Sequence, residues 1–161
     1  MLNWHLPKRK ICPQGHLWLL NSRPHGGKSM NRVSWGFVLA GLYNSGIGLF
    51  SHGFSDNLGA VDPLFSTQGC IGIQLWGLAY IALKDRYDVV PAMSAVFCLE
   101  KLFYGVHWLL WLSAHGDSLP DLMTQDFLTG LFFYIYGAGD LIFMVFFGWA
   151  AWRWRPQNQG T

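Results

Sequence analysis

Apolar residues gather in four segments of this chain, each about as long as a membrane-spanning helix. The segments cover residues 33–54, 66–83, 89–113 and 128–152. A helix needs roughly 20 apolar residues to cross a hydrocarbon layer of about 30 Å. The stretches between them are short, polar and rich in Asp, Pro and Gly, which is typical of turns. The pattern predicts an all-α integral membrane protein, built as an antiparallel bundle of four transmembrane helices.

The composition supports a lipid environment and a membrane role. Hydrophobic residues make up 52% of the chain and charged residues 12%, whereas a soluble domain carries roughly 25% charged residues. Nine Trp residues suit the membrane–water interface. A net charge of only +2 gives no electrostatic support for nucleic-acid binding. We therefore expect the lipid bilayer, and no nucleic acid, as a partner.

Positive charge is confined to one side of the predicted bundle. Of the 11 Lys and Arg residues, all but Lys101 lie before the first segment, between the second and third, or after the fourth. The two remaining loops carry no Lys or Arg and hold only acidic charges. Since positive loops stay on the cytoplasmic side, both termini are predicted to be cytoplasmic, in a multi-pass protein of the cell inner (plasma) membrane. The acidic residues of the opposite loops are Asp56, Asp62, Asp117, Asp121 and Asp126.

The two ends of the chain differ from the apolar segments. Residues 1–32 are polar, basic and interrupted by Pro and Gly, so we expect a disordered arm. Met30, followed by Asn31 and Arg32, stands just before the first apolar segment, which makes it an alternative start of translation. Residues 153–161 form a short basic tail. The predicted bundle thus occupies residues 33–152.

Ionisable side chains lie deep inside two of the apolar segments. Lys101 is about 12 residues into the third segment and Asp140 about 12 into the fourth from the opposite side, so a rise of 1.5 Å per residue places both near mid-bilayer. Such groups cost a few kcal/mol unless they are paired or face a protein interior or water. Asn44 and Gln74 reach similar depth. We expect these side chains and Glu100 to meet in one polar layer.

Two helical faces extend this polar layer towards the acidic side. Glu100, Tyr104 and His107 recur at intervals of four and three residues, which places them on one face of a helix. Tyr136 lies one turn from Asp140. The residues predicted to form a ligand-binding site or proton relay are therefore Glu100, Lys101, Asp140, His107, Tyr104, Tyr136, Asn44 and Gln74.

The charge balance of this cluster leaves two interpretations open. Lys101 and Asp140, helped by polar neighbours, can serve as an intramembrane ion pair that fixes helix register. However, two carboxylates against one cation leave a formal surplus of −1. A surplus charge in low dielectric takes up a proton or holds a cationic partner. The surplus favours a functional site.

No enzyme signature is present. The leading hypothesis is a non-enzymatic binding or accessory module that recognises a polar or cationic group and needs no cofactor. One alternative is a proton-coupled transporter or channel component, with Glu100 passing its proton through His107. Four helices leave little room for a wide pathway, so a transporter would form a homo-oligomer or join a larger membrane complex. A second alternative is a haem or metal redox protein with His52 and His107 as ligands.

Overall fold

The computed structural model describes residues 31–155, and these are helical with no strand among them. The all-α prediction is confirmed. The predictions for residues 1–30, for a start at Met30 and for residues 156–161 of the tail lie outside the described residues. The longer helices are α1 (Arg32–Ser45), α4 (Thr67–Leu83), α5 (Pro91–His115) and α7 (Phe127–Arg153). The short ones are α2 (Ile47–Phe50), α3 (Asn57–Val61), η1 (Pro63–Phe65), η2 (Gly116–Ser118) and α6 (Leu119–Gln125).

Three helical stretches are long and apolar enough to cross a membrane. They are Arg32–Phe50, Pro91–Gln125 and Phe127–Arg153. Helix α4 has only 17 residues, so its rise of 1.5 Å per residue gives about 25 Å, short of the roughly 30 Å of a hydrocarbon core. By this measure three of the four expected spans are long enough.

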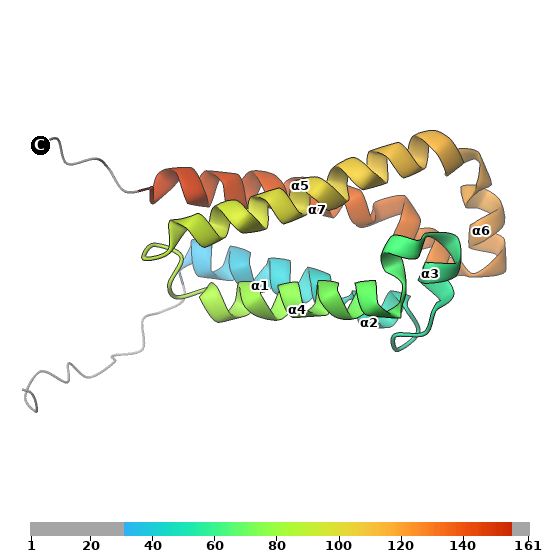
Figure 1. Ribbon diagram of the computed structural model, residues 1–161, viewed down its shortest axis with the longest axis horizontal. Helices are drawn as coiled ribbons and strands as arrows, with labels where there is room; N and C mark the ends of the chain where they lie inside the picture. The colour runs from blue at the N-terminus through green and yellow to red at the C-terminus, as the bar shows by residue number, and fades with distance from the viewer. Residues whose placement is uncertain (1–30, 156–161) are drawn as a thin grey trace, which may run out of the picture.

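The long helices associate in two pairs (Figure 1). Helix α1 contacts α4, and α5 contacts α7. Glycines allow close approach in both pairs: a Cβ atom on Gly41 would lie 2.7 Å from the carbonyl oxygen of Gly77, and one on Gly105 would lie 2.6 Å from Leu141 Cδ2. The described part of the chain begins and ends at the same end of the molecule.

The loops differ from the turns that the sequence predicts. The first helical stretch ends at Phe50 rather than continuing to residue 54, because His52, Gly53 and Phe54 have positive φ angles of 50°, 77° and 66°. That left-handed backbone cannot continue a right-handed helix. The two polar connections expected at residues 55–65 and 114–127 contain α3 and η1 in the first, and η2 and α6 in the second.

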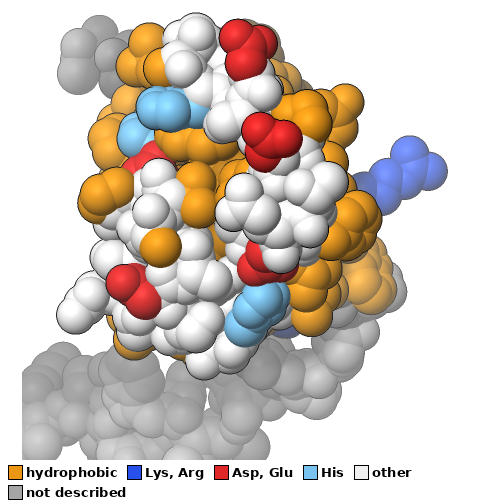
Figure 2. Space-filling model, turned by 90° about the vertical axis from the view of Figure 1, so that its right-hand side faces the viewer, with side chains coloured by type: hydrophobic (Ala, Val, Ile, Leu, Met, Phe, Trp, Pro, Cys, Tyr) orange, Lys and Arg blue, Asp and Glu red, His pale blue; other side chains and the backbone are white. Residues whose placement is uncertain are grey.

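One end of the molecule is acidic. Figure 2 shows this end, where Asp and His side chains lie on the face and Lys or Arg is visible only at its margin. Residues 51–66 and 116–126, which form it, contain no Lys or Arg. Among residues 31–155, every Lys and Arg except the buried Lys101 lies elsewhere, at or just beyond the ends of α1, α4 and α7. These residues are Arg32, Lys84, Arg86, Arg153 and Arg155.

Candidate ligand-binding site

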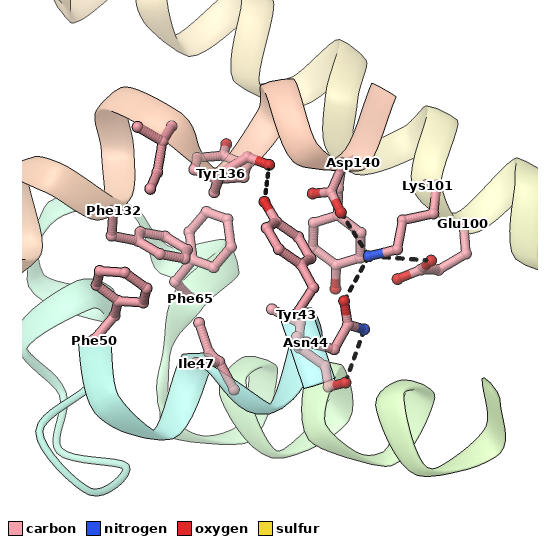
Figure 3. A pocket seen from close by; sticks show the side chains of 13 residues that line it. Tyr43, Asn44, Ile47, Phe50, Phe65, Glu100, Lys101, Phe132, Tyr136 and Asp140 are labelled. Atoms are coloured by element: carbon pink, nitrogen blue, oxygen red, sulfur yellow. Dashed lines mark hydrogen bonds and ion pairs between the residues drawn. The ribbon is translucent and has the colours of Figure 1, made fainter. Parts of the chain in front are cut away.

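Lys101 joins three helices at the centre of the fold (Figure 3). Its side chain extends from α5 and the residue is 2% exposed. Nζ donates to Asp140 Oδ1 of α7 at 2.5 Å and to Asn44 Oδ1 of α1 at 2.6 Å. Glu100 Oε2 is 3.9 Å from Nζ, which is too long for a hydrogen bond. The ammonium group is thus held by one carboxylate and one amide.

The partners of Lys101 are positioned by the neighbouring helices. Asn44 Nδ2 donates to the carbonyl oxygen of Ile73 in α4 at 3.1 Å, which turns its Oδ1 towards Lys101. Near Asp140, α7 carries Gly139, whose missing side chain leaves space that the ring of Tyr43 fills. Tyr43 OH donates to the carbonyl oxygen of Tyr136. These contacts fix α1, α4 and α7 around the ammonium group.

Glu100 is the second carboxylate of the cluster, and only one of its two carboxylate oxygens has a hydrogen-bond partner among the described residues. Its side chain is 7% exposed, and Oε2 accepts a hydrogen bond from Tyr80 OH. Oε1 is buried without a hydrogen-bond partner among residues 31–155, and so is the OH of Tyr136. A buried acceptor without a donor costs the desolvation free energy of that group. Glu100 Oε1 and Tyr136 OH are therefore available to a bound molecule.

Both of these atoms belong to residues that line a cavity of about 70 Å³ between the two helix pairs. A space of about 10–15 Å³ on this measure holds one water molecule, so the cavity holds a few waters or a small ligand. Figure 3 shows Lys101 and Asp140 towards one end and Phe50, Phe65 and Phe132 towards the other. The remaining lining residues are Tyr43, Asn44, Ile47, Ile73, Glu100, Tyr104, Ile135 and Tyr136.

The structure brings together six of the eight residues predicted for the site. Glu100, Lys101, Asp140, Tyr104, Tyr136 and Asn44 all line the cavity. Gln74 does not line the cavity, and its Nε2 donates to Ser45 Oγ of α1 at 3.0 Å. Gln74, the residue of α4 that the sequence predicts for the polar layer, therefore does not contribute to the cavity lining.

His107 also lies apart from the cavity lining. Its Nε2 is 2.6 Å from Asp62 Oδ2, in the turn before η1, and its side chain is 32% exposed. Within residues 31–155 no hydrogen bond joins His107 to Glu100. The proton route from Glu100 through His107 is thus not continuous in the described hydrogen bonds.

The two predicted haem ligands have different partners. His52 Nε2 is 3.6 Å from Asp126 Oδ2, whereas His107 contacts Asp62. Among residues 31–155 no group of three or more His, Cys, Asp or Glu side chains is placed to hold a metal ion. These contacts do not direct the two imidazoles towards a common metal ion or haem iron.

Two tyrosines of the site were missed from the sequence. The rings of Tyr43 and Tyr80 lie with their centroids 5.5 Å from Lys101 Nζ, within the range of cation–π attraction. Tyr80 could have been found, since it continues a face of α4 with buried positions at intervals of three and four residues. That face consists of Cys70, Ile73, Gly77 and Tyr80.

Comparison with known proteins adds no function to this geometry. No protein-family model, curated protein or solved structure matches the chain. The side chains around the cavity are therefore the basis on which a function is assigned.

Proposed function

We propose that the protein is a multi-pass protein of the inner membrane, with four antiparallel transmembrane helices and both termini cytoplasmic. The fourth span is α4, which pairs with α1. Its 17 residues stand at the lower limit of about 17–25 for a spanning helix, and Lys84 at its end can extend its ammonium group to the interface. The basic helix ends lie on the cytoplasmic side and the acidic loops on the other.

Lipid is the proposed partner of the outward faces of these helices. Large apolar side chains are exposed along all four, which in water would form an unfavourable surface. In a bilayer the same side chains contact acyl chains at no such cost. Examples are Leu39 and Leu42 on α1, Leu75 and Leu78 on α4, Leu99 and Leu102 on α5, and Ile142 and Val145 on α7.

Within this bundle we propose a non-enzymatic binding function: the cavity holds a small cation or polar group inside the membrane. The observation that carries the proposal is Glu100 Oε1, a buried carboxylate oxygen that lacks a hydrogen-bond donor among residues 31–155 and belongs to a residue that lines the cavity. Glu100 and Asp140 together oppose only Lys101, so the cluster has a formal charge of −1. A bound cation would neutralise this charge and supply the missing donor.

Two other roles explain less of the geometry. An ion pair that only fixes helix register accounts for Lys101, Asp140 and Asn44, but it leaves Glu100 Oε1 unsatisfied. A proton-coupled transporter calls for a path from Glu100 towards the acidic end. The contacts described lead instead from Glu100 to Tyr80 and from His107 to Asp62. Binding is therefore the function that these contacts support best.

Calorimetric titration of methylammonium chloride into the full-length protein in detergent tests this function. Glu100→Gln removes the charge but keeps the shape of the side chain, and we expect it to weaken binding by at least about tenfold, as for a lost charge-assisted hydrogen bond. Asp117→Asn is the matched control, since Asp117 is an exposed carboxylate at the acidic end. Equal affinity in wild type and Glu100→Gln would reject the proposal.

A further inference from the structure

The two ends of the cavity differ in chemistry, and the difference constrains the ligand. The charged end presents Glu100, Lys101 and Asp140, whereas the far end is built from Phe50, Phe65 and Phe132 (Figure 3). The rings of Phe65 and Phe132 pack edge to face with centroids 4.9 Å apart, and a side chain of this kind offers no hydrogen bond. A molecule that fills the whole cavity must therefore be charged at one end and apolar at the other.

The charged end also selects the kind of cation. A carboxylate oxygen only accepts hydrogen bonds, so Glu100 Oε1 needs a donor, and the OH of Tyr136 can accept a second. A primary ammonium group has three N–H donors, as the side chain of lysine does. A quaternary ammonium ion has none and would leave Glu100 Oε1 unsatisfied. The site thus favours a cation with N–H groups.

The volume of the cavity limits the size of the ligand's apolar substituent. A volume of about 70 Å³ is several times the space for one water molecule on this measure, but it is too small for a long chain or a fused ring. Ile47 and Ile73 also line this space. The apolar substituent is therefore short.

We infer that the cavity takes a small primary ammonium ion with a short apolar substituent. The ammonium group lies against Glu100 Oε1, and the substituent points towards Phe65 and Phe132. This inference rests on the proposed binding function and adds the class of ligand. It also gives the aromatic end a role, because burying each CH₂ group there strengthens binding.

A matched pair of probes tests the need for N–H donors. Tetramethylammonium and tert-butylammonium are isomers of nearly equal size and equal charge, but only the latter has N–H groups. We expect tert-butylammonium to bind the wild-type protein at least about tenfold more tightly, as for the loss of hydrogen bonds to a charged acceptor. Equal affinities, or tighter binding of tetramethylammonium, would overturn the inference.

A chain-length series tests the aromatic end. From methyl- to ethyl- to propylammonium, affinity should rise by about fourfold per CH₂ group, until the cavity is full. Ile47→Val removes one methyl group from the wall and should shift the best chain to a longer homologue. Ile71→Val is the control, because Ile71 is exposed on α4 and should leave the series unchanged.

The outcomes separate this inference from the proposed function. If methylammonium binds in a Glu100-dependent manner but affinity does not rise with chain length, the ligand class is wrong and the binding function stands. If methylammonium does not bind, both fail. The probe comparisons use the wild-type protein, so they do not depend on whether a variant folds.

Discussion

The ring of Tyr43 occupies the space that a side chain at residue 139 would need. A Cβ atom on Gly139 would overlap Cζ and OH of Tyr43. This contact allows Tyr43 OH to reach the carbonyl oxygen of Tyr136 in α7. The ring of Tyr43 also lines the cavity and lies over the ammonium group of Lys101. The missing side chain of Gly139 thus leaves the space in which the Tyr43 ring packs beside the polar cluster.

Gly139→Ala should therefore destabilise the protein. Displacing the Tyr43 ring costs about 1–3 kcal/mol, as for other overpacked interiors, and should weaken methylammonium binding as well. Unfolding in mixed micelles measures the first effect. Gly72→Ala is the control, because a Cβ atom at Gly72 of α4 meets nothing within 4 Å. If Gly139→Ala and Gly72→Ala are equally stable, the position of the Tyr43 ring does not depend on the missing side chain at residue 139.

Asp126, which precedes α7, should make stability depend on pH. Its Oδ1 accepts from the backbone N–H groups of Leu128 and Thr129, and its Oδ2 from Thr129 Oγ1. The hydrogen bond from the Thr129 hydroxyl, with the backbone N–H groups and the nearby His52, holds the pKa of the Asp126 carboxyl below its ordinary value of 3.8. A lowered pKa means that the folded protein releases this proton more readily than the unfolded chain.

The stabilisation by Asp126 is thus complete above the pKa of the unfolded carboxyl and is lost as pH falls through the lower pKa of the folded state. Asp126→Ala should cost about 1 kcal/mol at pH 7, as for loss of a helix cap. The difference from wild type should shrink below about pH 4. Unfolding measured between pH 2 and pH 7 tests this. A difference that stays constant across that range would show that the carboxylate is not the stabilising form.

The proposed topology predicts which loops a membrane-impermeant maleimide reaches in intact cells. In a background where Cys12, Cys70 and Cys98 are replaced, Ser118→Cys should be labelled without permeabilisation. Asp88→Cys should be labelled only after it. Both residues are exposed, so unequal labelling reports the side of the membrane. The reverse pattern would place the termini outside.

Counting residues along the apolar segments predicted that Lys101 and Asp140 lie at a similar height, because height in an antiparallel pair of helices follows from the rise per residue alone. Lys101 and Asp140 are 39 positions apart, yet they lie in contact. Depth does not fix rotation about the helix axis. Gln74 has suitable depth but lies off the buried face of α4 and bonds to Ser45, whereas Tyr80 lies on that face.

The loops could not be deduced in the same way. Asp62 and Asp126 were expected only as acidic charges in turns, but each accepts a backbone N–H group at the start of a helix. They also face His107 and His52. Such contacts depend on how a loop folds back over the helix ends. Apolar periodicity contains no signal for that path.

Lys101 and Asp140 compensate each other's charge inside the protein, and a double-mutant cycle measures this coupling. Lys101→Ala and Asp140→Ala should each lower the free energy of unfolding by about 3–5 kcal/mol, because each leaves a buried charge without its partner. The double variant should lose less than the sum of the two. If both single variants are as stable as wild type, or if their effects simply add, the two groups are not a buried pair and the account of the cavity fails with them.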